Sequence, residues 1–134
     1  MLWLLVLLYA GARVLQAFPD RIPIFAIFTL HVVPPFLFAL VHGARRYGLR
    51  GILLFTGLCL AIGNFTENVG VLTGVPFGRY HFTDVMGPKV FQAPILLGMA
   101  YVGIGYVSWI LGLLMAGGIG KPLAGYRVLT VPLV

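Results

Sequence analysis

Residues 52–71, "ILLFTGLCLAIGNFTENVGV", form an apolar run that becomes polar only toward its end. A helix rises 1.5 Å per residue, so a run of roughly 20 residues crosses the hydrocarbon core of a bilayer. Asn64 and Glu67 enter only in the last turns of this run. The stretch therefore predicts a membrane-spanning helix with a carboxyl group close to one end.

The whole chain has the composition of a membrane protein. Of its 134 residues, 60% are hydrophobic and 9% are charged, and the mean hydropathy is +1.04. These are too few polar groups to cover a soluble globule. The formal charge of +6 indicates cytoplasmic loops and lipid headgroups, not a nucleic-acid partner. Cys59 is the single cysteine, which excludes an intrachain disulfide and a thiolate metal site.

The same length rule divides the chain into four spans and a stub. Helices are expected near residues 2–17, 22–43, 50–72 and 90–115. Residues 122–134 are apolar again but cover about half a span, as in a chain that has been truncated. We expect an all-α polytopic transmembrane helical bundle with about four spans plus a truncated fifth, forming one transmembrane domain over residues 1–134. Such a fragment is expected to be inactive or unstable alone.

Basic residues determine the expected orientation in the cell membrane. The densest cluster, Arg45, Arg46 and Arg50, separates the second and third spans and places that loop and the N-terminus in the cytoplasm. Five of the nine basic residues then lie on the cytoplasmic side and four on the other: Arg45, Arg46, Arg50, Lys121 and Arg127 against Arg13, Arg21, Arg79 and Lys89. The chain is expected to be a multi-pass membrane protein.

Glu67 lies on a helix face made of small residues. At spacings of four, three and four, and if the helix persists, this face carries Gly63, Glu67, Gly70 and Gly74. Glycines there let another helix or a flat ligand approach, and Asn64 and Asn68 can hydrogen-bond the acid. An ionisable group inside a membrane is costly and usually marks a site. The alternative is that Glu67 meets water at the interface or pairs with Arg79.

Residues 75–88 separate the third and fourth expected spans. Their glycines and prolines predict a folded turn or re-entrant segment instead of a helix. The segment interleaves charged and aromatic side chains: Phe77, Arg79, Tyr80, His81, Phe82 and Asp84. Such a mixture suits the mouth of an apolar pocket, and equally an interfacial aromatic belt. No compact ligand motif joins Glu67, His81 and Asp84, so no metal site is expected.

The fourth expected span offers a second small-residue face. Gly98, Gly105 and Gly112 repeat every seven residues, with Tyr101 and Ser108 at intervening positions. This spacing gives a groove with two hydroxyl groups. Tight helix packing explains the same spacing without a ligand.

The stretch "ENVGVLTGVPFGRYHFTDVMGPKVFQAPILLGMAY", residues 67–101, resembles the signature region of the integral-membrane carotenoid biosynthesis family, which includes the carotenoid hydratases. A glutamate, a Gly-x-x-x-Gly, a Pro-Phe-Gly-x-Tyr and a Met-Gly-Pro-Lys run follow one another in the family's order. The match is specific over residues 64–101 and generic elsewhere. The motif positions that carry over, without assigned roles, are Glu67, Gly70, Gly74, Pro76, Phe77, Gly78, Arg79, Tyr80, Gly87, Pro88 and Lys89.

The resemblance implies an enzyme, a carotenoid hydratase of the lyase class. Such an enzyme adds water across the terminal double bond of an acyclic carotenoid and leaves a tertiary alcohol. Its site needs a carboxylic acid, a held water and aromatic faces that stabilise a cation. On this interpretation Glu67 or Asp84 is the acid, and His81, Tyr80 or Tyr101 holds the water. The candidate substrate-binding residues are Asn64, Gly70, Gly74, Phe77, Arg79, Phe82, Tyr101 and Ser108.

The same resemblance implies no cofactor. The expected partners are the carotenoid substrate, the lipid bilayer and other enzymes of carotenoid biosynthesis. Two alternatives stay open. A proton-initiated carotenoid isomerase or cyclase begins with the same protonation, whereas a small transporter or assembly subunit would use Glu67 as a proton or ion relay.

Overall fold

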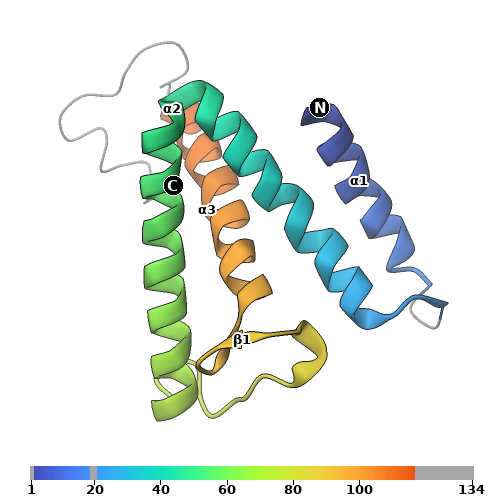
Figure 1. Ribbon diagram of the computed structural model, residues 1–134, viewed down its shortest axis with the longest axis vertical. Coiled ribbons are helices and arrows are strands. Elements are labelled where there is room, and N and C mark those ends of the chain that lie inside the picture. Colours follow the sequence, from blue (N-terminus) through green and yellow to red (C-terminus); the bar gives the residue numbers. More distant parts are fainter. Residues whose placement is uncertain (1, 19–20, 117–134) are drawn as a thin grey trace. The chain divides into compact units, whose positions relative to one another are not determined.

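The computed structural model describes residues 2–18 and 21–116. Helices make up most of this part (Figure 1), which confirms the all-α prediction. The elements in chain order are α1 (Leu2–Leu15), α2 (Ile24–Thr73), the short 3-10 helix η2 (Asp84–Met86), β1 (Lys89–Val90), β2 (Ala93–Pro94) and α3 (Ile95–Met115). The chain divides into two compact units, and the boundary between them lies within α3, between Gly103 and Ile104. Glu67, Tyr80 and Tyr101 all lie in the first unit.

Helix α2 consists of two helical segments joined at Gly48. Within its 50 residues the dihedral angles leave the helical region only at Gly48, where φ is 76° and ψ is 164°. Glycine adopts such angles without the steric penalty that a Cβ brings. The chain changes direction where the two segments of α2 join (Figure 1). The second and third helices expected from the sequence are therefore both present, joined by a single glycine within the basic cluster instead of by a loop.

Two of the described helices, α2 and α3, are long and apolar enough to cross a membrane. Only 17% and 28% of their most apolar windows are buried, whereas a core helix of a soluble protein would be mostly buried. Both observations indicate membrane association. Helix α1 has 14 residues and is about 21 Å long, less than the roughly 30 Å hydrocarbon core. Four full spans are thus not shown, and the expected fifth, at residues 122–134, lies outside the described residues.

The segment between α2 and α3 is folded but contains no α-helix. Residues 75–88 hold one 3-10 turn at Asp84–Met86, in agreement with their glycine and proline spacing. Residues 90–94 were expected to begin the last helix, and this expectation is wrong. They belong to an antiparallel hairpin, residues 89–94, in which Lys89 lies opposite Pro94 and Val90 opposite Ala93.

The hairpin forms because its turn has a partner on α2. Phe91 takes a positive φ of 56°, which a continuing right-handed helix does not allow. The backbone N–H of Gln92 donates to Asn68 Oδ1 at 2.8 Å, and that of Ile95 donates to the Pro88 oxygen at 2.9 Å. Helix α3 therefore begins only at Ile95.

Candidate functional site

Glu67 is the centre of the candidate site. Its side chain is buried, at 8% exposure, in the second segment of α2. Both carboxyl oxygens have partners: the Tyr101 hydroxyl bonds with Oε1, and the Tyr80 hydroxyl donates to Oε2 at 2.7 Å. The site therefore joins a helix, the loop that follows it and the next helix. Among the described residues no ion pair joins Glu67 to Arg79, so the expected alternative in which these two residues pair is not what the structure shows.

Two glycines of α2 make room for the two phenols. A Cβ built on Gly63 would lie 2.6 Å from Cδ2 of Tyr101, and a Cβ on Gly70 would lie 2.6 Å from the Tyr80 hydroxyl oxygen. Real Cβ atoms essentially never approach other atoms so closely. The rings thus occupy space that only glycine leaves free. The small face predicted around Glu67 is present, and the protein's own tyrosines cover it.

Gly74 and the asparagines have other roles than the sequence suggested. Gly74 is the left-handed C-cap of α2, with φ 76°, and its N–H donates to Gly70 O at 2.8 Å. It therefore ends the helix instead of extending the face. Asn68 Nδ2 donates to the backbone oxygen and to Oδ1 of Asn64, at 2.7 and 2.9 Å. Among the described residues, the side-chain amide of Asn68 thus bonds to Asn64 and to the backbone N–H of Gln92 in the hairpin turn, and not to the Glu67 carboxyl group.

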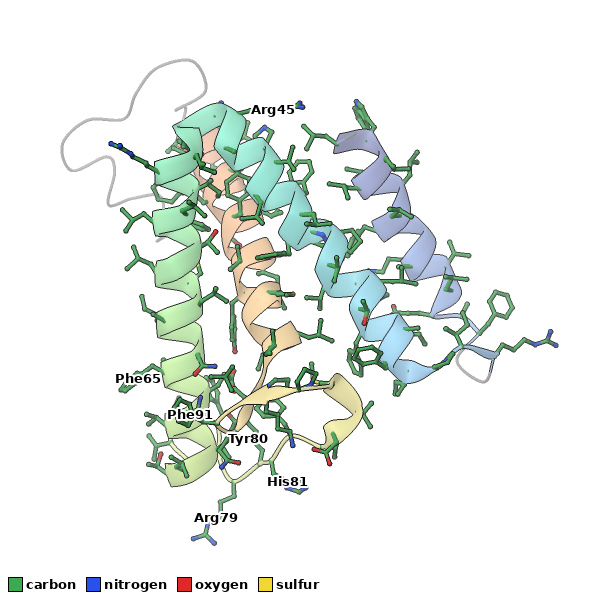
Figure 2. The ribbon with its side chains drawn as sticks, in the orientation of Figure 1. Arg45, Phe65, Arg79, Tyr80, His81 and Phe91 are labelled. Carbon is green, nitrogen blue, oxygen red and sulfur yellow. The ribbon has the colours of Figure 1, made fainter. Side chains whose placement is uncertain are left out.

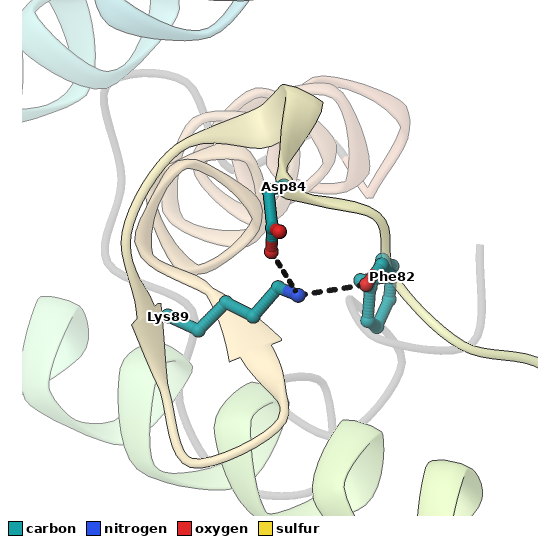
Figure 3. Close-up of polar contacts among 3 residues, drawn as sticks. All are labelled: Phe82, Asp84 and Lys89. Carbon is teal, nitrogen blue, oxygen red and sulfur yellow. Dashed lines mark hydrogen bonds and ion pairs between the residues drawn. The ribbon is translucent and has the colours of Figure 1, made fainter.

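Asp84, the second candidate acid, lies in a different environment from Glu67. Its side chain is 99% exposed and pairs with Lys89 Nζ at 2.8 Å. Lys89 Nζ also donates to the backbone oxygen of Phe82 at 2.8 Å (Figure 3). The hydrogen bond from Lys89, followed by its positive charge, lowers the pKa of Asp84. An exposed carboxyl group that stays ionised is a poor proton donor.

The other predicted site residues divide into two groups. Phe82 lies beside the centre, because its ring meets that of Tyr80 edge to face with centroids 5.5 Å apart. Arg79 and His81 point outward (Figure 2), and both they and Phe77 are exposed. Ser108 is exposed and belongs to the unit that begins at Ile104.

Four residues that contact the partners of Glu67, or the segments that carry those partners, were not among the expected site residues: Gly63, Asn68, Lys89 and Gln92. Gly63 shares the helical spacing of Glu67, and Lys89 belongs to the Met-Gly-Pro-Lys run, so a signal for both was present. Asn68 was considered only as a partner of the acid. Gln92 takes part through its backbone N–H, which any residue except proline supplies.

The pKa of Tyr80 depends on its hydrogen bond to Glu67. That hydrogen bond, followed by desolvation and the nearby negative charge, raises the pKa of Tyr80 to about 12. Because the neutral phenol is the favoured form in the folded protein, the contact stabilises the fold below pH ~10, the ordinary value, and this contribution is lost as the pH rises toward 12. In Glu67→Gln we expect the pKa of Tyr80 to fall toward 10, since an amide carries no charge.

Tyrosinate absorbance of the protein in detergent micelles measures this pKa. The Tyr80 step is identified as the one that disappears in Tyr80→Phe. A Tyr80 pKa that stays near 12 in Glu67→Gln would contradict the contact.

Comparison with known proteins agrees with the sequence motifs. A model of the carotenoid biosynthesis protein family matches residues 22–133, which include all of α2, the hairpin and α3. No curated protein sequence and no solved structure is detectably similar to the chain. The family match contains Glu67 and both of its tyrosine partners and extends over most of the sequence. The chain therefore belongs to the carotenoid biosynthesis protein family.

Proposed function

We propose that this protein is a carotenoid hydratase in which Glu67 is the general acid. Membership of the family supports a general role in carotenoid biosynthesis. The two long apolar helices support association with the bilayer, where an acyclic carotenoid dissolves. The observation that carries the proposal is a buried carboxyl group with a phenol on each of its oxygens.

The reaction needs one group that both gives and takes a proton. Glu67 donates its proton to the less substituted carbon of the terminal double bond, which leaves the positive charge on the tertiary carbon. A water oxygen bonds to that carbon, and the excess proton of the water returns to the Glu67 carboxylate. One water is added, the acid is regenerated, and no redox step or cofactor takes part.

The two tyrosines suit this cycle because a hydroxyl group can donate or accept a hydrogen bond. When Glu67 is ionised, both phenols donate to it. When Glu67 is protonated, its O–H donates to one phenol oxygen while the other phenol still donates. Tyr80 and Tyr101 can therefore hold the carboxyl group in place through both states. Either hydroxyl can also orient the attacking water.

Aromatic faces beside the carboxyl would stabilise the cationic intermediate. The rings of Tyr80 and Phe82 meet edge to face, so the face of at least one ring is directed away from the other. A positive carbon placed over such a face gains about 0.5–2 kcal/mol, more when water is excluded. The chemistry of the site is thus carried by Glu67, Tyr80, Tyr101 and Phe82.

Expression of the protein in cells that accumulate an acyclic carotenoid tests the proposal. We expect a pigment heavier by one water, with a tertiary hydroxyl group at one end. When membranes that contain the protein are incubated with the unlabelled carotenoid in heavy water, deuterium should be found on the carbon next to the one that carries the new hydroxyl group. A pigment of unchanged mass but altered structure would instead identify an isomerase or cyclase. Unchanged pigments would favour the transporter or assembly subunit.

A further inference from the structure

Both phenols of the Glu67 site come from outside the helix that carries Glu67. Tyr80 lies 13 residues after it in sequence, and Tyr101 lies 34 residues after it. Tyr80 is in the irregular loop, and Tyr101 is about two turns into α3. Their positions on the carboxyl therefore depend on what holds the 89–94 hairpin, which lies between them in sequence.

Lys89 holds the loop on the Tyr80 side. It lies on β1, its side chain is 26% exposed, and its ammonium group donates to both Phe82 O and Asp84 Oδ1 at 2.8 Å. These acceptors lie two and four residues after Tyr80, and the Phe82 ring packs against the Tyr80 ring. Figure 3 shows the ammonium group between its two acceptors. Lys89 thus ties the hairpin to the segment that leads back to Tyr80.

Asn68 holds the hairpin on the Tyr101 side. It follows Glu67 directly on α2, and its side-chain amide is oriented by two bonds to Asn64. The remaining oxygen accepts the N–H of Gln92 in the hairpin turn. Helix α3 starts three residues later, at Ile95. Holding the hairpin turn in place therefore sets where α3 begins relative to Glu67. It also sets the position of Tyr101 along the axis of α2.

We infer that Lys89 and Asn68 are positioning residues of the Glu67 site, Lys89 acting through Tyr80 and Asn68 acting through Tyr101. This inference deepens the proposed hydratase function and rests on it. Neither residue touches the reacting atoms. A displacement of about 1 Å in a catalytic group can lower a rate about 100-fold, so loosening either tie is expected to lower the rate about 10- to 100-fold.

A double-mutant cycle separates positioning from a general loss of structure, because residues that act through one contact have non-additive effects. Lys89→Met should lower the hydration rate about 10-fold or more in the wild-type background. In the Tyr80→Phe background the same change should lower it by less than about twofold. Arg50→Met removes one positive charge in the basic cluster near Gly48 and serves as the control, with activity unchanged. Rate losses that multiply in the double variant would overturn the role of Lys89.

The same design applies to Asn68. Asn68→Leu keeps the side-chain size but removes the acceptor for Gln92 N–H, and its effect should largely disappear in the Tyr101→Phe background. Thr66→Val is the control on the same turn of α2, because the Thr66 hydroxyl donates to backbone oxygens of its own helix, those of Ile62 and Gly63. Equal losses from Asn68→Leu with Tyr101 present or replaced would overturn its role.

The pKa of Tyr80 can be measured without any enzymatic activity, so it tests the positioning roles independently of the proposed function. If Lys89 holds Tyr80 on Glu67, Lys89→Met should shift the Tyr80 pKa from about 12 toward 10, its ordinary value. Lys89→Gln, which keeps a hydrogen-bond donor, should shift it less and serves if Lys89→Met does not accumulate. A Tyr80 pKa unchanged in both variants would overturn the inference even if hydration is confirmed. A shifted pKa without hydration by the wild type would overturn only the proposed function.

Discussion

Replacement of Glu67 by glutamine is expected to lower the rate of hydration by about 100- to 10,000-fold, the contribution of a general acid. Glutamine keeps the shape of the side chain and can still bond with Tyr80 and Tyr101, but it has no carboxyl proton to give. The protein should still accumulate in the membrane. The measurement is the yield of hydroxylated pigment per amount of membrane protein, in cells that supply an acyclic carotenoid.

The controls for this variant distinguish chemistry from folding. Asp84→Asn should have a smaller effect, because Asp84 is exposed and, among the described residues, its side chain is linked to the site through Lys89. Near-normal hydration by Glu67→Gln would remove Glu67 as the acid. Loss of the protein from the membrane would show that the carboxyl group is needed for the fold.

A methyl group at Gly70 is expected to have the second largest effect, a loss of about 100-fold. The Cβ of Gly70→Ala would lie 2.6 Å from the Tyr80 hydroxyl oxygen, about 0.8 Å short of an ordinary contact of 3.4 Å. The hydroxyl must therefore move away from Glu67. Gly63→Ala should act in the same way on Tyr101, since its Cβ would meet three atoms of that ring within 3.2 Å.

Gly57→Ala is the matched control for both glycine variants. Gly57 lies on the same segment of α2, and a Cβ built there meets no atom of the described residues within 4 Å. Alanine favours a helix over glycine by up to about 1 kcal/mol, so this variant should be at least as stable as the wild type and fully active. Full activity of Gly70→Ala, with the pKa of Tyr80 still near 12, would show that the phenol does not rest on Gly70.

Local patterns in the sequence were sufficient for the helices and for one face of the site. Apolar runs predicted the two segments of α2 and most of α3, although not the start of α3 at Ile95, because a residue's preference for lipid does not depend on its partners. The four- and three-residue spacing of Gly63, Glu67 and Gly70 placed them on one face, since helical periodicity fixes which side chains are neighbours. Glycine and proline also predicted the break in helix over residues 75–88, because both act on the backbone dihedrals of their own position.

The tertiary structure decided which groups meet. From the sequence, Asn64 and Asn68 were expected to bond to the acid, and Tyr80, Tyr101 and His81 were equal candidates for holding water. In the fold, Tyr80 and Tyr101 meet on Glu67, Asn68 receives Gln92, and residues 90–94 form a hairpin turn instead of a helix. The physical reason is the separation along the sequence between the residues that meet. Periodicity relates residues one or two turns apart, whereas contacts across 13 to 34 residues depend on the path of the backbone through Gly74, Gly87 and the hairpin, and on which acceptor each buried donor reaches.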